Sequence, residues 1–240
     1  SNWRAKGTLE DRLVAEGVVA IRGVDTRALT RHLRERGAMR AGVFSGSQAQ
    51  APVAELVERV RASAPMAGAD LTADVTTPEP YVVPAIGPRR FTVAAVDLGI
   101  KAMTPRRMAE RGIDVHVVPA SWSAEQIRAI GADGVFFSNG PGDPATADAA
   151  VALMSAFLAE RTPVFGICFG NQVLGRALGL GTYKLRYGHR GVNQPVKDLA
   201  TGQVAITAHN HGFAVDAPRE GDFDTAFGRA TVSHVCLNDD

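Results

Sequence analysis

The stretch Val164-Phe165-Gly166-Ile167-Cys168-Phe169-Gly170-Asn171-Gln172 decides the fold of this 240-residue chain. It begins with a short apolar run at 164–167, which indicates a strand, and it leads into a helical pattern at 171–178. Two glycines and a cysteine occupy the turn between them. A strand that turns directly into a helix is typical of βαβ units, in which helices cover a parallel sheet.

The same alternation of strand and helix runs upstream of this stretch. Short apolar runs are separated by segments with helical spacing. Helical connections of this kind are right-handed and join parallel strands, so the carboxyl ends of the strands lie at one edge of the sheet. The sequence therefore predicts an α/β fold with a doubly wound, mostly parallel sheet. We expect strands at 91–97, 114–118 and 134–137, and helices at 101–111, 124–130 and 145–160.

Different patterns lie on either side of this α/β segment. After Gly179 the helical spacing stops, and four strand-like runs at 182–187, 192–196, 203–207 and 212–215 predict an antiparallel appendage. Residues 76–90 contain four prolines, which are too many for a helix or a central strand, so we expect a linker there. The chain then divides into a first domain at 1–75, the linker at 76–90 and the α/β domain at 91–240.

Residues 1–75 indicate part of a smaller α+β domain. We expect a strand at 18–21 and a helix at 26–34, with Asp25 as its N-cap and Gly37 as its stop. A second helix is expected at 53–60, where apolar residues follow helical spacing.

Composition limits the classes of function. The formal charge is +1, with 45% hydrophobic and 21% charged residues, so no global field recruits nucleic acid or an acidic membrane. The six arginines between Arg22 and Arg40 lack interleaved aromatic residues, and we interpret them as a solvated helix face or a subunit contact. No apolar run reaches the roughly 20 residues of a membrane helix, and two cysteines make no disulfide framework. We expect a cytoplasmic protein that binds neither nucleic acid nor membranes.

Cys168 is the candidate nucleophile. In a Gly-x-Cys-x-Gly turn the cysteine sits in strained backbone space, and glycine is needed two residues away on each side to avoid collisions. The N-terminus of the following helix is expected to lower the pKa of the thiol. The alternative is a buried, inert cysteine beside a flexible turn.

Two further segments carry polar residues. The loop 138–144 follows a predicted strand, lies at the carboxyl edge of the sheet and contains glycines, so its main-chain N–H groups can form part of an oxyanion hole together with Phe169. His209 and His211 form a His-x-His pair with His189 twenty residues upstream. This spacing is poor for a metal site, so we expect no metal and interpret these histidines as pocket walls or turn residues.

These motifs resemble a known family. Residues 165–172 are similar to the nucleophile motif of class I (triad) glutamine amidotransferases. Segments 138–144, 188–196 and 210–215 resemble the small, glutamine-hydrolysing chains of carbamoyl-phosphate synthases, and 23–39 is similar to the N-terminal domain of those chains. The resemblance covers nearly the whole sequence.

The resemblance implies a reaction and a set of residues. Cys168 would attack the carboxamide of L-glutamine and release ammonia through a cysteinyl thioester. Gly142 and Phe169 would supply the oxyanion-hole amides. The residues that the resemblance places around glutamine are Gly140, Gly142, Phe169, Gln172, Asn210, Gly212 and Phe213.

The resemblance also implies a partner. Ammonia would pass to a large synthetase chain that makes carbamoyl phosphate for arginine and pyrimidine synthesis. ATP and Mg²⁺ would bind to that large chain, so no cofactor is expected in this one.

Three features depart from the family pattern. The N-terminal domain of the family normally begins well upstream of Ser1. Phe169 and Asn171 replace the usual leucine and histidine, and none of the six histidines is followed two residues later by glutamate, as in the family's His-Pro-x-Glu segment. We therefore expect a chain that is truncated at both ends and nearly inactive alone. The alternatives are a degenerate amidotransferase that serves as a non-catalytic binding or regulatory subunit, and an unrelated thiol hydrolase of the α/β-hydrolase type.

Overall fold

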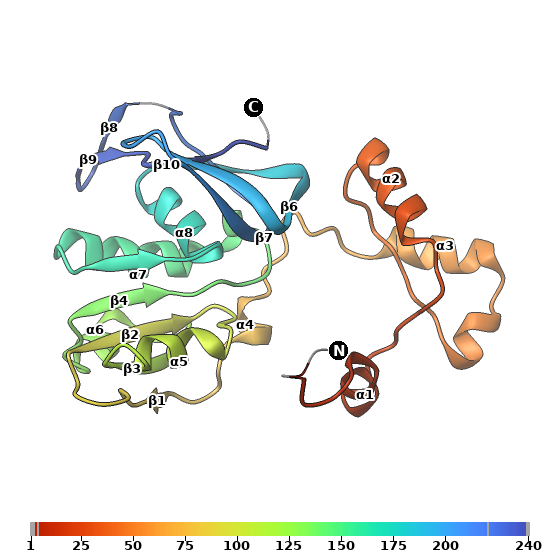
Figure 1. Cartoon of the computed structure of the whole chain (residues 1–240), viewed down its shortest axis with the longest axis horizontal. Helices are drawn as coiled ribbons and strands as arrows, with labels where there is room; N and C mark the ends of the chain where they lie inside the picture. The colour runs from red at the N-terminus through yellow and green to blue at the C-terminus, as the bar shows by residue number, and fades with distance from the viewer. Residues whose placement is uncertain (1–2, 4, 220, 239–240) are drawn as a thin grey trace. The chain divides into compact units, whose positions relative to one another are not determined.

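The computed structural model describes residues 3, 5–219 and 221–238, and the chain forms two compact units (Figure 1). The first unit is Ser1–Pro65 and the second is Met66–Asp240. In the described part of the chain, no helix combines the length and the apolar character that crossing a membrane requires.

The described residues of the first unit form helices and loops. The predicted helix 26–34 is α2 (Thr26–Arg36), and Asp25 caps it by accepting a hydrogen bond from the N–H of Ala28 at 2.9 Å. Gly37 ends this helix with φ 92°, as expected. The other elements are α1 (Leu9–Ala15), η1 (Gly46–Gln50) and α3 (Val53–Ala62), which confirms the predicted helix at 53–60.

The strand predicted at 18–21 does not form, and that prediction was wrong. Val18 and Val19 lie exposed in an extended loop without a ladder partner among the described residues. A β-branched run becomes a strand only where a neighbouring strand pairs with it. The sequence reasoning also missed α1, which begins with a capping box between Thr8 and Asp11.

The core of the second unit is a five-stranded sheet in the order β1-β3-β2-β4-β5. β2, β3, β4 and β5 are parallel, and β1 runs antiparallel to β3 at the edge. This confirms the mostly parallel sheet. The strands are β1 (Tyr81–Val83), β2 (Phe91–Asp97), β3 (Ile113–Pro119), β4 (Gly134–Phe137) and β5 (Val164–Gly166).

Helices cover both faces of this sheet (Figure 1). On one face Met108 of α5 packs against a cluster that includes Val117 and Phe136. On the other face Met154 of α7 and Val173 of α8 are fully buried in the larger cluster. The sheet is therefore doubly wound, as predicted. The helices are α5 (Met103–Ala109), α6 (Ala124–Arg128), α7 (Asp148–Ala159), which follows η2 (Pro144–Thr146), and α8 (Phe169–Ala177).

The boundary between the units lies upstream of the proline-rich segment 76–90. Residues 66–77, which include α4 (Thr72–Val75), are tied to the second unit by buried carboxylates. Asp143 accepts a hydrogen bond from the N–H of Gly68, and Asp97 accepts one from the N–H of Thr77, both at 2.8 Å. The segment 76–90 itself contains β1, whose edge position is compatible with flanking prolines.

The antiparallel appendage is present, but its four predicted strands are two long ones. β6 (Gly181–Asp198) and β7 (Val204–Asp216) pair with β-bulges at two places. Gly188 and Gly191 have φ values of 75° and 132° and lie at these bulges. The sequence predicted a loop between two strands at this segment, but the glycines belong to irregular positions within one strand. β10 (His234–Cys236) joins β6, and β8 (Asp222–Thr225) pairs with β9 (Gly228–Thr231).

Candidate active site

Cys168 occupies the sharp turn between β5 and α8. Its φ and ψ are 55° and −108°, a conformation that non-glycine residues rarely adopt. A Cβ on Gly166 would lie 2.4 Å from the carbonyl carbon of Gly170, and a Cβ on Gly170 would lie 2.1 Å from the oxygen of Phe137. The structure therefore confirms why both flanking positions are glycine.

The loop after β4 lies beside this turn. Ser138 is fully buried, its Oγ accepts a hydrogen bond from the N–H of Leu98 at 2.9 Å, and its carbonyl accepts one from the N–H of Gly170 at 3.1 Å. A Cβ on Gly140 would lie 2.1 Å from the oxygen of Leu98. The loop thus joins the ends of β2 and β4, where the strand order reverses and open α/β sheets bind ligands.

The thiol of Cys168 is surrounded by main-chain groups. Its Sγ lies 3.8 Å from the carbonyl oxygen of Asn210 on β7, to which the thiol donates. The main-chain N–H groups of Phe169 and Gly140 act on the sulfur so that the thiolate is favoured, which lowers the pKa. The carbonyl oxygen of Asn210 therefore stabilises the protonated thiol, whereas the two N–H groups stabilise the thiolate.

Burial raises the pKa of the Cys168 thiol above its ordinary value. The N–H groups of Phe169 and Gly140 and the charge of Lys101 act in the opposite direction, but they do not outweigh the loss of solvent. The prediction that the helix N-terminus leaves this thiol with a lowered pKa was therefore wrong. At neutral pH the cysteine is mainly protonated, and reaction requires removal of its proton.

This environment predicts the effect of replacing Lys101. Removal of its positive charge destabilises the thiolate, so Lys101→Ala should raise the pKa of Cys168 further. The rate of alkylation by iodoacetamide, measured against pH in a Cys236→Ala background, should show a midpoint above that of the unsubstituted chain. Lys101→Arg keeps the charge and should restore the midpoint, whereas an unchanged midpoint in Lys101→Ala would remove this residue from the site.

The remaining predicted residues lie where α8 meets β7. Gln172 is buried, and its Nε2 donates to the carbonyl oxygen of Phe213 at 2.6 Å. Asn210 accepts a hydrogen bond at Oδ1 from Arg190 at 2.6 Å. At Gly212 a Cβ would lie 3.3 Å from the Nζ of Lys184, so two cationic side chains flank this part of β7.

The structure thus brings some of the predicted residues to the sulfur and places others farther out. Asn210 contacts the thiol through its carbonyl oxygen, and the N–H groups of Phe169 and Gly140 favour the thiolate form. Gln172 and Phe213 connect the helix that carries Cys168 to the strand that carries Asn210. Gly142 has φ 95°, and a Cβ there would lie 2.8 Å from the oxygen of Ala69, so its role as an oxyanion-hole amide stays a prediction.

The sequence reasoning missed three cations near these residues. Lys101 lies four residues after the end of β2. In the sequence, this position just after a predicted strand was the one indication that Lys101 lies at the carboxyl edge of the sheet. Lys184 and Arg190 lie on β6, opposite the part of β7 that holds Asn210 and Gly212. Their proximity depends on the pairing of two long bulged strands, which composition and spacing do not indicate.

A cysteine on a strained strand-to-helix turn, at the carboxyl edge of a doubly wound sheet, has the features of a thiol nucleophile in an α/β domain. The family model "Glutamine amidotransferase class-I" matches residues 94–240. The chain belongs to the class-I glutamine amidotransferase family. Residues 1–43 match a second model, "Carbamoyl-phosphate synthase small chain, CPSase domain".

Curated relatives match the chain over its whole length. The carbamoyl phosphate synthase small chain of Streptomyces avermitilis is 66% identical over 239 residues, covering 100% of this chain and 63% of the relative. That of Mycobacterium tuberculosis is 60% identical over 242 residues, covering 100% of this chain and 64% of the relative. The chain therefore spans less than two thirds of these relatives. A crystal structure of a glutamine amidotransferase from Thermotoga maritima is 16% identical, with a TM-score of 0.43, and the match covers 56% of this chain and 66% of that one.

Proposed function

We propose that Cys168 hydrolyses the side-chain amide of glutamine. The sulfur attacks the carboxamide carbon, the C–N bond breaks, and the nitrogen leaves as ammonia with the proton that the thiol gave up. Water then cleaves the thioester to glutamate and regenerates the thiol. The observation that carries this proposal is the strained turn that holds Cys168 between β5 and α8, with glycines at 166 and 170 that no larger residue could replace without a collision.

Those N–H groups also suggest how the tetrahedral intermediate is stabilised. An oxyanion hole needs preorganised donors within hydrogen-bond distance of the developing charge. Phe169 and Gly140 hold such donors beside the sulfur, where the attacked carbonyl must lie. We therefore assign this role to Phe169 and Gly140, with Gly142 as the donor that family resemblance suggests.

The similarity to carbamoyl phosphate synthase small chains suggests which reaction uses the ammonia. We propose that it is used by a large partner chain that makes carbamoyl phosphate, and that ATP and Mg²⁺ bind to that partner. Arginine and pyrimidine synthesis are the pathways that this role would serve.

We further propose that these 240 residues alone turn over slowly. The contacts of Sγ among the described residues come from main-chain groups and the charge of Lys101, and none comes from a side chain that can accept its proton. Loss of a general base costs about 10²–10⁴-fold in rate. The same observation favours the second candidate, a subunit that binds glutamine or a partner without catalysis.

A glutamine-mimicking electrophile, such as a diazoketone analogue of the amino acid, tests the proposed function. Peptide mapping should find the adduct on Cys168 and not on Cys236, although both cysteines are half-buried. Excess glutamine should protect Cys168, and excess asparagine, which is one methylene shorter, should protect it poorly. Equal labelling of both cysteines, or labelling that glutamine does not slow, would contradict a glutamine site; protection without any turnover would favour the non-catalytic subunit.

A further inference from the structure

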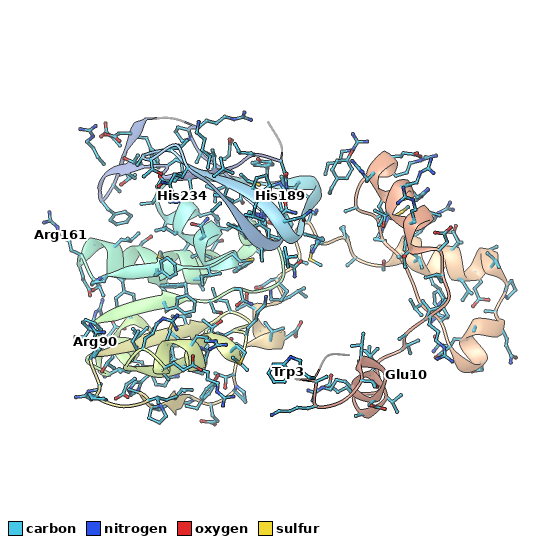
Figure 2. The ribbon with its side chains drawn as sticks, in the orientation of Figure 1. Trp3, Glu10, Arg90, Arg161, His189 and His234 are labelled. Carbon is cyan, nitrogen blue, oxygen red and sulfur yellow. The ribbon has the colours of Figure 1, made fainter. Side chains whose placement is uncertain are left out.

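Three histidines come together on the antiparallel sheet. His189, which Figure 2 labels, lies on β6. It pairs directly with His211 on β7, and His209 is two residues away from His211 on the same strand. The ring centroids are 4.8 Å apart for His189 and His211, 5.2 Å for His209 and His211, and 5.7 Å for His189 and His209. One ring nitrogen from each residue lies within 4.8 Å of the other two, and all three side chains are partly buried.

The hydrogen bond of His211 defines its tautomer. Its Nδ1 lies 2.8 Å from the carbonyl oxygen of Phe213. A carbonyl oxygen can only accept, so Nδ1 carries the proton and donates. In the neutral ring, Nε2 of His211 is therefore the nitrogen with the lone pair.

The tautomer of His209 is defined by a longer chain of hydrogen bonds. Its Nε2 lies 3.0 Å from Oγ1 of Thr207, and this hydroxyl donates its single proton to the carbonyl oxygen of Gln194 at 2.9 Å. Thr207 must then accept from His209, so Nε2 carries the proton. In the neutral ring, Nδ1 of His209 has the lone pair.

These assignments make two lone pairs face each other. Nδ1 of His209 and Nε2 of His211 are 3.4 Å apart. A cation between the two nitrogens would accept both lone pairs.

The spacing of the two nitrogens fits a metal ion. With Zn–N distances of about 2.0–2.1 Å and tetrahedral angles, two ligand nitrogens lie about 3.4 Å apart. The hydrogen bonds to Phe213 and Thr207 would act as outer partners that fix the two rings. Imidazole ligands suit Zn²⁺ and neighbouring transition metals.

We propose that His189, His209 and His211 bind a divalent transition-metal ion of the Zn²⁺ class, with a water molecule as the fourth ligand. The ion would join β6 to β7 at the segment whose Asn210 carbonyl contacts Cys168. This site goes beyond glutamine hydrolysis and does not depend on it. The expectation of no metal rested on sequence spacing, which does not include the cross-strand pairing of His189 with His211.

Co²⁺ titration of the untagged full chain tests the proposal, in a Cys168→Ala/Cys236→Ala background that removes both thiolates. We expect one ion per chain, the intense visible bands of four-coordinate Co²⁺, and displacement by Zn²⁺. His209→Gln should weaken Zn²⁺ affinity by more than about 100-fold, and Thr207→Val by about 10–100-fold. Thr207→Ser keeps the hydroxyl, and His234→Gln alters an exposed histidine on the same sheet, so both should bind as the parent does.

Several results would overturn the site. These are sub-stoichiometric binding, the weak spectrum of six-coordinate Co²⁺, and equal affinity in His209→Gln and His234→Gln. Nitrogen NMR of the chain with and without Zn²⁺ gives a separate check. Ligation should shift the Nδ1 resonance of His209 and the Nε2 resonance of His211, and unchanged resonances at both nitrogens would contradict the site.

Discussion

Replacement of Cys168 by alanine is expected to abolish glutamine hydrolysis and thioester formation. Loss of the nucleophile in enzymes of this covalent type costs up to about 10⁶-fold in turnover, because the remaining groups can only polarise the amide. The measurement is ammonia release together with mass spectrometry of acid-quenched protein. Because a nucleophile and its base act as a unit, a loss of about 10⁴-fold or more is expected only in a preparation that contains a functional base; for the slow 240-residue chain the decisive result is the absence of the thioester mass.

Cys236→Ala is the matched control for this substitution. Cys236 lies on β10, is also half-buried, and belongs to the antiparallel sheet rather than to the strand-to-helix turn. Its replacement should leave ammonia release unchanged. Turnover that survives in Cys168→Ala would mean that another residue attacks the amide or that water attacks directly, and the covalent mechanism would have to be abandoned.

The parts of the fold that were predictable depend on local constraints. The turn at Cys168 needs glycines at 166 and 170 because both positions approach other main-chain atoms closely, and this requirement is visible as a motif. The α2 helix has a capping aspartate and a terminal glycine, and β2 and β4 match their predicted bounds because each is a short apolar run. Alternation of such elements left few topologies to consider.

The parts that were missed depend on contacts between distant residues. The pairing that brings His189 opposite His211 follows from the register of two long bulged strands, which a one-residue slip would destroy. The raised pKa of Cys168 reflects the partial burial of its side chain, and sequence reasoning considered only the adjacent helix terminus. The boundary at Pro65 depends on carboxylates at 97 and 143 that hold the segment 68–77.

Gly170→Ala is expected to lower the free energy of unfolding by a large amount. The added Cβ would lie 2.1 Å from the carbonyl oxygen of Phe137 and 2.7 Å from its carbonyl carbon. These are backbone atoms of the interior strand β4, which pairs with β2 and β5, so they cannot move aside as a flexible side chain would. Overpacking against a fixed core costs about 1–3 kcal/mol, and a backbone collision at this distance places the expected loss at or above about 3 kcal/mol.

Urea unfolding followed by Trp122 fluorescence measures this loss in the second unit, because Trp122 packs against the larger core cluster. A Trp3→Phe background removes the exposed tryptophan of the first unit. With a slope of about 2–3 kcal/mol/M, the midpoint should fall by about 1 M or more. Gly181→Ala is the control, since its Cβ would meet no atom closer than 3.8 Å, and it should change stability by no more than about 0.5 kcal/mol. Equal midpoints for the two variants would show that β4 and α8 can separate at little cost, and the rigid turn that positions Cys168 would then lose its physical basis.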